Sequence, residues 1–181
     1  MSGQPGPGDG KRSGRPLASP AMRAAPATLV AVLAAALAGC GSGGEAPFTG
    51  RVERVVDGDT IIVEAPGGRE RVRYIGIDTP ESVAPDRPVE CFGPEASAAN
   101  RRLVEGREVK VVPGPESRDR YGRLLAYVYT DGGKRFVNGA LVRSGAADTL
   151  TIEPNTDRAG ELAALRREAR SERAGMWGSC R

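Results

Sequence analysis

Three short clusters of acidic residues and arginines contain the side chains that could do chemistry. They are Asp57-Gly58-Asp59-Thr60, then Arg73 with Asp78-Thr79-Pro80-Glu81, and then Asp119-Arg120-Tyr121-Gly122-Arg123. Carboxylate oxygens are the ligands that a hard cation such as Ca²⁺ or Mg²⁺ prefers. A planar guanidinium can hold two phosphate oxygens at once, and two of them can stabilise extra negative charge on a phosphate. Together these residue types indicate hydrolysis of a phosphodiester.

The residues that the chain lacks narrow this interpretation. None of its 181 residues is a histidine. Serine–histidine and cysteine–histidine nucleophile pairs are therefore excluded, as is the commonest general base. The three cysteines cannot form a closed structural zinc site, which needs four nitrogen or sulfur ligands. Any hydrolysis must depend on carboxylates, arginines and a metal ion.

Each cluster also has a plainer interpretation. The run Asp57 to Thr60 is typical of a hairpin turn, and Asp78-Thr79-Pro80 is typical of a turn at the end of a strand. A single arginine usually forms a surface ion pair. Two turns that both present carboxylates at the ends of neighbouring strands are better explained by a shared site for an oxygen-liganded cation.

The elements that must position these clusters begin with strands. Segments rich in Val, Ile and Tyr predict strands at 48–56, 60–65, 69–77, 109–112 and 124–129. Pro66-Gly67-Gly68 predicts a hairpin between the second and third of them. In the third, Arg71, Arg73 and Ile75 share one face of the strand, opposite Val72, Tyr74 and Gly76.

Helices are predicted later in the chain, at 94–104, 136–144 and 157–173. Pro94 suits a first helical position, while Gly106 and Gly145 are typical stops. Strands followed by helices predict an α+β fold, a small antiparallel barrel with packed helices.

The N-terminal part of the chain differs in composition from the rest. Residues 29–38 form an unbroken apolar run, preceded by Arg23 and followed by Leu37-Ala38-Gly39-Cys40. The pattern resembles a bacterial lipoprotein signal peptide, which implies export and a lipid anchor on Cys40 at the outer face of the membrane, or release from the cell. A run of this length is too short to span a bilayer as a helix. Because residues 1–21 make an unusual leader, we expect Met22 to be the true start.

These observations divide the chain into four parts. Residues 1–39 are the predicted leader and signal peptide, 40–47 a flexible spacer, 48–178 the folded domain and 179–181 a tail. Removal of the leader lowers Lys plus Arg from 26 to 22 and Asp plus Glu from 23 to 22. Net charge therefore gives no general attraction to a polyanion, and affinity must come from a local site.

Export would place Cys91 and Cys180 in an oxidising compartment, where we expect them to form a disulfide. Two unpaired thiols are the alternative, since sequence alone does not prove a pairing. A disulfide would join the C-terminal tail to the middle of the domain.

Five motifs in one order resemble the staphylococcal nuclease (thermonuclease) family. They are Val56-Asp57-Gly58-Asp59-Thr60, Arg73 with Ile77-Asp78-Thr79-Pro80-Glu81, Gly93-Pro94-Glu95-Ala96-Ser97, Asp119 to Tyr129, and Val137-Asn138-Gly139-Ala140-Leu141-Val142. The resemblance extends from about Phe48 to Trp177. It implies a five-stranded OB-like β-barrel with three packed α-helices, a scaffold suited to oligonucleotides.

The resemblance also implies a role for each residue. Asp59 and Asp78 would bind Ca²⁺ through their carboxylates and Thr79 through its backbone carbonyl. Asp57 would support that metal site from nearby. The implied activity is Ca²⁺-dependent cleavage of DNA or RNA by a monomer, with 3′-phosphate products.

The remaining implied roles concern the substrate. Glu81 would orient or deprotonate the attacking water. Arg73 and Arg123 would bind the scissile phosphate, and Arg120 and Tyr121 a further phosphate.

One segment departs from the family pattern. Residues 146–154 lack the tyrosines that usually follow the second helix, and the spacing is one residue short. The sequence therefore does not predict which bases the protein prefers. The loop 83–89 is a candidate to replace the contacts of the missing tyrosines. Two other functions stay possible on the sequence alone: a barrel that binds nucleic acid or protein without cutting, and a structural envelope lipoprotein.

Overall fold

The computed structural model describes residues 45–82 and 88–180. The predicted signal peptide, the Met22 start and Cys40 lie outside these residues, as does most of the 83–89 loop. In the described part of the chain, no helix has the length and apolar character needed to cross a membrane.

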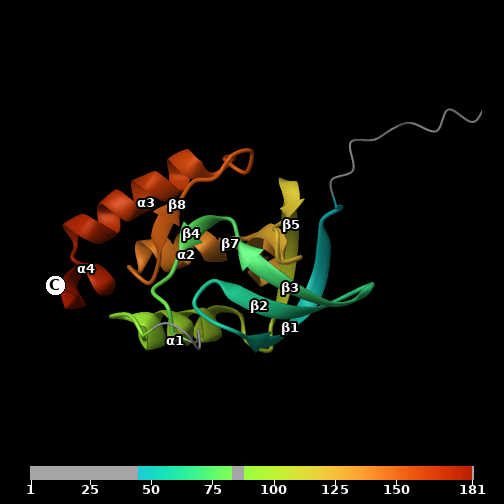
Figure 1. The fold of residues 1–181 in the computed structure, drawn as a ribbon, viewed down its shortest axis with the longest axis horizontal. Helices are drawn as coiled ribbons and strands as arrows, with labels where there is room; N and C mark the ends of the chain where they lie inside the picture. Colours follow the sequence, from blue (N-terminus) through green and yellow to red (C-terminus); the bar gives the residue numbers. More distant parts are fainter. Residues whose placement is uncertain (1–44, 83–87, 181) are drawn as a thin grey trace, which may run out of the picture. The chain divides into compact units, whose positions relative to one another are not determined.

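Five strands form a closed barrel, as the sequence predicted, but the barrel is mixed and not wholly antiparallel. They are β1 (Phe48–Val55), β2 (Thr60–Ala65), β3 (Gly68–Tyr74), β5 (Glu108–Arg118) and β6 (Leu124–Thr130). Neighbours pair antiparallel in the order β3-β2-β1-β5-β6, and a parallel pairing of β3 with β6 closes the barrel. The short β7 (Arg135–Phe136) follows a 3₁₀ turn at Asp131–Gly133 and extends β6 at its outer edge. Figure 1 shows β1, β2 and β3 side by side.

The prediction of one strand over 69–77 is wrong, because the chain bends at Gly76. β3 ends at Tyr74, and Gly76 has a φ of 79°, a conformation that residues with a side chain rarely adopt. The next residues form β4 (Gly76–Asp78), which pairs with β8 (Asp148–Leu150) in a separate two-stranded sheet. Asp78 therefore belongs to this second sheet, where it contacts Arg73 of the barrel strand β3.

The fourth predicted strand, 109–112, is too short. β5 continues to Arg118 through Pro113 and Pro115, with an irregular register against β6 between Pro113 and Arg118. Prolines indicate a strand end because they donate no backbone hydrogen bond. Beyond the prolines, the side chain of Asn155 pairs with the β5 backbone, since it accepts from Glu116 N at 3.0 Å and donates to Glu116 O at 2.9 Å.

All three predicted helices are present with slightly different bounds. They are α1 (Gly93–Val104), α2 (Val137–Arg143) and α3 (Ala159–Ser171), and a short α4 (Met176–Ser179) that the sequence did not predict follows them. Helix α2 contacts both α1 and α3. The α+β prediction, a five-stranded barrel with three packed helices, is thus confirmed.

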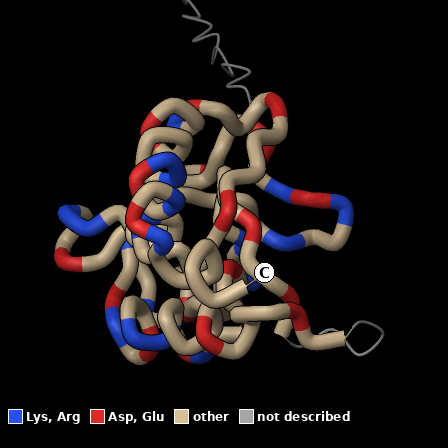
Figure 2. The backbone as a smooth tube through the Cα atoms, turned by 90° about the vertical axis from the view of Figure 1, so that its left-hand side faces the viewer, with Lys and Arg blue, Asp and Glu red and all other residues tan. Residues whose placement is uncertain are grey.

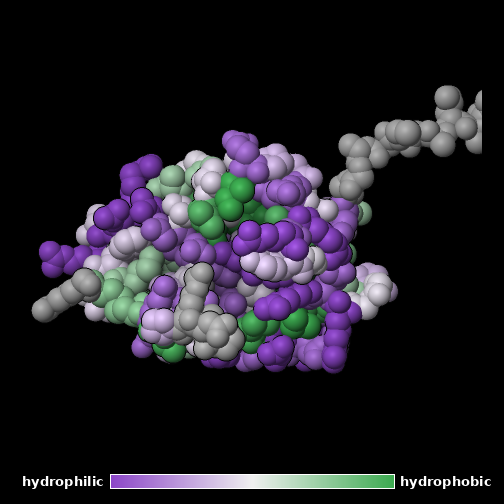
Figure 3. Space-filling model, in the orientation of Figure 1, coloured by the Kyte–Doolittle hydropathy of each residue, from purple (hydrophilic) through white to green (hydrophobic). Residues whose placement is uncertain are grey.

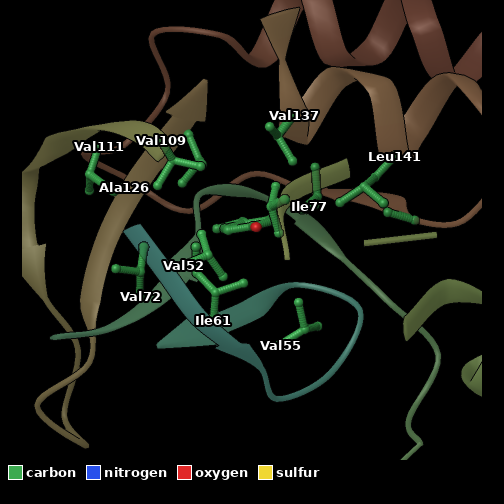
Figure 4. Close-up of a cluster of buried hydrophobic side chains, with 14 of the residues drawn as sticks. Val52, Val55, Ile61, Val72, Ile77, Val109, Val111, Ala126, Val137 and Leu141 are labelled. Atoms are coloured by element: carbon green, nitrogen blue, oxygen red, sulfur yellow. The ribbon is translucent and has the colours of Figure 1, made fainter. Parts of the chain in front are cut away.

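The core lies inside the barrel and under the helices. Apolar side chains from every barrel strand and from α1, α2 and α3 are buried there, among them Ile61, Val72, Leu124, Leu141 and Leu162. Figure 4 shows how these side chains from strands and helices meet. The buried Tyr74 hydroxyl donates to Asn100 Oδ1 of α1 at 3.0 Å, so the core also fixes a helix beside the strand that carries Arg73.

Cys91 and Cys180 form a disulfide, with a Cα–Cα distance of 5.9 Å. This is the pairing that the sequence analysis expected. It joins the residues just before α1 to the residue just after α4.

Candidate active site

One pocket gathers most of the residues that the sequence singled out. It has a volume of about 350 Å³ and is lined by Asp57, Asp59, Arg73, Asp78, Thr79, Pro80, Glu81, Tyr121 and Arg123. Asp57 and Asp59 come from the β1–β2 turn, and Arg73 comes from β3. Residues 78–81 lie at the end of β4 and directly after it, and Tyr121 and Arg123 belong to the β5–β6 turn. Segments far apart in sequence therefore converge through closure of the barrel.

Asp59 lies at the centre of this pocket and is only 5% exposed. Its Oδ2 accepts hydrogen bonds from the backbone N and the Oγ1 of Thr79, both at 3.0 Å. Its Oδ1 lies 3.0 Å from Arg73 Nε. The approach to Thr79 depends on Gly58, because a Cβ there would lie 2.6 Å from Thr79 Oγ1.

Asp57 supports the turn that carries Asp59. Its Oδ1 accepts a hydrogen bond from Asp59 N at 3.0 Å, and its backbone carbonyl accepts one from Asn100 Nδ2 at 3.1 Å. The segment is a turn closed by Val56 N donating to Thr60 O at 2.9 Å. The turn interpretation of Asp57 to Thr60 is therefore correct, and the same turn places Asp57 and Asp59 in the lining of the pocket.

Burial and like charges disfavour ionisation of the two central carboxylates. Burial raises the pKa of Asp59 to about 7; Arg73 opposes this shift, while Asp57 and Asp78 add to it. The pKa of Asp78 is also raised, by burial and then by Glu90, Asp148 and Glu81, again against Arg73. One guanidinium thus does not neutralise the negative charge collected here, and further positive charge is favoured in the pocket.

Arg73 is held rigidly by four groups. Its Nη1 donates to the carbonyls of Tyr74 and Ile77, both at 2.8 Å, and its Nη2 donates to Asp78 Oδ1 at 2.8 Å. The fourth contact is the Asp59 pair. The guanidinium spans the bend between β3 and β4, so the fold itself orients the group that faces the pocket.

Glu81 lies after β4, on the same side of the pocket as Asp78 and Thr79. Its Oε1 accepts a hydrogen bond from Ser82 N at 2.9 Å. The Ser82 hydroxyl is 2.8 Å from that of Ser97 on α1. The catalytic glutamate expected from the sequence therefore lies on a segment attached to α1.

The opposite wall of the pocket comes from the β5–β6 turn. Arg123 Nε donates to Asp119 Oδ2 at 2.7 Å, and Asp119 Oδ1 accepts from the backbone N of Arg123 at 3.0 Å and of Tyr121 at 2.9 Å. The guanidinium carbons of Arg120 and Arg123 lie 4.8 and 5.5 Å from the centre of the Tyr121 ring. Tyr121 is 68% exposed and is open to a ligand.

A second pocket of about 340 Å³ shares Arg73, Tyr121 and Arg123 with the first. Arg120 lines this neighbouring pocket and not the first one. Leu150 and Ile152 also line it, and they are 40% and 58% exposed. Figure 3 shows hydrophobic surface surrounded by hydrophilic residues on the face seen in Figure 1.

The oxygen donors of the first pocket fit a hard cation. Asp59 and Asp78 offer carboxylates, and Thr79, which contacts Asp59, lines the same pocket. Within residues 45–82 and 88–180, no group of three or more His, Cys, Asp or Glu side chains is placed so that it could hold a metal ion by itself. Ca²⁺ takes six to eight oxygen ligands and accepts water and phosphate among them, so a partial protein ligand set suits an ion that also contacts substrate.

The sequence analysis assigned no role to three residues that shape the pocket. Asp119 holds Arg123, and its position two residues before Tyr121 is typical of an aspartate that closes a turn. Asn100 fixes the Asp57 carbonyl, and its spacing of four from the buried Ala96 and Val104 predicts an inward-facing position. Glu90 contacts Glu81, and no sequence pattern predicts this contact.

Comparison with known proteins agrees with the geometry. A family model described as "Staphylococcal nuclease homologue" matches residues 71–179. The thermonuclease of Staphylococcus hyicus is 37% identical over 129 residues, covering 71% of this chain and 75% of that protein. Endonuclease YncB of Bacillus subtilis (strain 168) is 38% identical over 128 residues, covering 70% of this chain and 60% of that protein. The SPbeta prophage-derived endonuclease YokF of the same organism is 40% identical over 128 residues, covering 70% and 43%. With a closed barrel, a converged pocket and these matches, the chain belongs to the staphylococcal nuclease family.

Proposed function

We propose that this protein is a Ca²⁺-dependent nuclease that hydrolyses phosphodiester bonds in DNA and/or RNA. The observation that carries the proposal is the single pocket that joins Asp59, Asp78 and Glu81 to Arg73 and Arg123. The family membership and the names of the relatives support nuclease activity. We also infer 3′-phosphate products and a monomeric enzyme from the family resemblance.

The metal would be held by the Asp59 and Asp78 carboxylates and by Thr79, with Asp57 supporting the turn. Bound Ca²⁺ would supply positive charge that neutralises the phosphate and lowers the repulsion of an incoming nucleophile. The raised pKa values of Asp59 and Asp78 support this assignment, because crowded, buried carboxylates are stabilised by a cation.

The two guanidinium groups act on the phosphate from opposite walls. Arg73 is fixed by the β3–β4 bend and Arg123 by Asp119. Charge builds up on the phosphate oxygens as the nucleophile attacks, and groups already in place stabilise that charge without further rearrangement. Removal of one such donor typically costs about 3 kcal/mol, a hundredfold or more in rate.

Glu81 accepts the proton of the attacking water or orients that water. A group in this role must lie within hydrogen-bonding distance of the water, in a pocket that also holds the phosphate. Glu81 lines the same pocket as both arginines. In a protein without histidine, this carboxylate is the best placed general base.

The neighbouring pocket accounts for the rest of the nucleotide chain. Arg120 and Tyr121 would contact a further phosphate there. Leu150 and Ile152 are exposed where a base would pack, and aliphatic side chains lack the base stacking that contributes about 1–3 kcal/mol per base. We therefore infer weak base preference.

A barrel that binds nucleic acid or protein without cutting is the second candidate. Such a module would be expected to lose one of the five groups named above, but all five line the pocket. Figure 2 shows basic and acidic residues interspersed along the described chain.

The place of action is a proposal from the N-terminal sequence. We infer that residues 1–39 are removed, that Cys40 carries the lipid anchor, and that residues 40–47 separate the anchor from the domain 48–178 and its tail 179–181. The protein would then act outside the cytoplasm, at the outer face of the membrane or after release. Mass spectrometry of the protein from its host would test this, and an unmodified Cys40 preceded by residues 22–39 would contradict it.

The test of the activity is cleavage of DNA and of RNA by the purified protein with Ca²⁺ and then with chelator. We expect cleavage with Ca²⁺, none with chelator, and 3′-phosphate ends. Glu81→Gln should lower the rate a hundredfold or more, while Glu105→Gln, at an exposed glutamate outside both pockets, should not. Equal rates for wild type and Glu81→Gln would contradict the assignment, and binding without any cleavage would favour the second candidate.

A further inference from the structure

Glu90 contacts both backbone polar groups of Glu81. The backbone N of Glu90 donates to Glu81 O at 2.9 Å, and the backbone N of Glu81 donates to Glu90 Oε2 at 2.9 Å. Two bonds in opposite directions fix the rotation of a peptide segment as well as its position, which one bond does not. The second bond depends on the Glu90 side chain, so a substitution at Glu90 can remove it.

Residues that follow Glu90 in the chain also contact Glu81 and its neighbour Ser82. A Cβ on Gly93 would lie 2.4 Å from Glu81 O, so the first residue of α1 touches the Glu81 backbone directly. The buried Ser97 hydroxyl, on the next turn of α1, lies 2.8 Å from that of Ser82. The segment 90–97 therefore supports Glu81 and Ser82 through direct contacts; we call it the supporting segment.

The supporting segment is itself held by two bonds. Cys91, next to Glu90, is bonded to Cys180. Gly93 N donates to Glu90 O at 3.0 Å, which joins Glu90 to the start of α1. A residue held in this way transmits the rigidity of the helix to whatever it contacts.

We propose that Glu90 is a positioning residue. Its carboxylate accepts a hydrogen bond from the Glu81 backbone N–H and thereby fixes the position at which the Glu81 carboxylate contacts the attacking water. This inference rests on the proposed function of Glu81. Its physical basis is that a displacement of about 1 Å in a catalytic group can cost about a hundredfold in rate. Toward Glu81 the Glu90 carboxylate acts as a hydrogen-bond acceptor, an effect separate from the charge by which it helps to raise the pKa of Asp78.

The variants Glu90→Ala and Glu90→Gln separate these two roles. Alanine removes the acceptor, whereas glutamine keeps an acceptor oxygen at the same reach and removes the charge. With the full chain, Ca²⁺ and a DNA substrate, we expect Glu90→Ala to lower kcat by about tenfold to a hundredfold with little change in KM. Glu90→Gln should stay within about threefold of the wild type, as should the control Glu105→Ala. A Glu90→Gln variant as slow as Glu90→Ala would overturn the acceptor role.

A double-mutant cycle tests whether Glu90 acts through Glu81. If it does, Glu90→Ala should change the residual rate of Glu81→Gln much less than it changes the rate of the wild type, because the group to be positioned is already gone. An equal loss in both backgrounds would overturn the proposal in favour of a general structural effect. Wild-type activity of Glu81→Gln alone would instead contradict the proposed function, so the two failures are distinguishable.

Amide hydrogen exchange gives a reading that does not depend on activity. Glu90→Ala should speed exchange of the Glu81 amide, which then lacks its acceptor, and leave the amide of Val72 in the core unchanged. If Glu90→Ala does not fold, the same measurement is made on Glu90→Ser. The serine side chain is too short to reach the Glu81 amide. An unchanged Glu81 amide in a folded variant would refute the contact on which the inference depends.

Discussion

Arg73 and Arg123 have similar proposed roles but different attachments, so equivalent substitutions should differ in one respect. Arg73→Lys and Arg123→Lys should each lower the cleavage rate a hundredfold or more, because lysine does not hold two phosphate oxygens at once. Arg73→Lys should also lower Tm, since Arg73 donates to the carbonyls of Tyr74 and Ile77 across the bend. The side chain of Arg123 donates to Asp119 of its own turn, and its loss should lower Tm less than the loss of Arg73. Kinetics with calorimetry checks this, and equal Tm values for the two variants would contradict it.

Asp119 should make stability depend on pH in the acid range. Burial acts to raise the pKa of Asp119, but hydrogen bonds from Arg123 and from the backbone of Arg123 and Tyr121 outweigh it and lower the pKa. A carboxylate with a lowered pKa stabilises the fold above its unfolded pKa of about 4, and that contribution is lost as pH falls through the folded value.

Asp119→Asn should therefore lower the free energy of unfolding by about 1 kcal/mol at pH 7. The difference from the wild type should shrink as pH falls below about 4. Urea unfolding at several pH values measures this, with Asp157→Asn at an exposed position as the control. A difference that stays constant with pH would exclude an effect of charge.

At the scale of the elements, the bend between β3 and β4 should tolerate no side chain. Gly76 has a φ of 79°, and a Cβ there would lie 2.5 Å from Leu162 Cδ1 of α3. Gly76→Ala should cost about 1–3 kcal/mol in the free energy of unfolding. Gly67→Ala, where a Cβ meets no atom within 4 Å, should change it by less than about 0.5 kcal/mol. Urea unfolding of both variants measures the two free energies. Equal values for Gly76→Ala and Gly67→Ala would show that a side chain at the bend causes no strain.

The same bend shows how far the sequence predicted the elements and where it failed. Alternation of Val72 and Tyr74 with Arg71 and Arg73 identified the strand correctly, because it reports which side chains face the core. It did not report the end of the strand, which depends on a tertiary contact between Gly76 and α3. The long β5 was missed for a similar reason, since Asn155, far along the chain, pairs with the backbone of Glu116 in the part of β5 beyond the prolines.

The candidate site was predictable where short motifs carry it. Asp57, Asp59, Asp78, Glu81, Arg73 and Arg123 were all named from the sequence, and the structure brings them to one pocket. Residues that hold these groups in place were mostly not predicted. Glu90 and Asn100 act through contacts between segments distant in sequence, which spacing along the chain does not reveal.

At the scale of the molecule, the disulfide should account for a large part of stability. It closes a loop with a sequence separation of 89 residues, which the chain-entropy model values at about 4–5 kcal/mol. The double variant Cys91→Ser, Cys180→Ser should show that loss in urea unfolding under oxidising conditions. Reducing agent should destabilise the wild type but not the variant, and a response of both would contradict the assignment.

The parallel pairing of β3 with β6 has a consequence for recognition. A sheet with an open edge can bind an extended peptide by adding it as a further strand. In the described barrel, β3 is paired on both sides and only the two-residue β7 extends past β6. A macromolecule that docks on the barrel wall therefore cannot be added to it as a further strand, and side chains that protrude from the wall must recognise it.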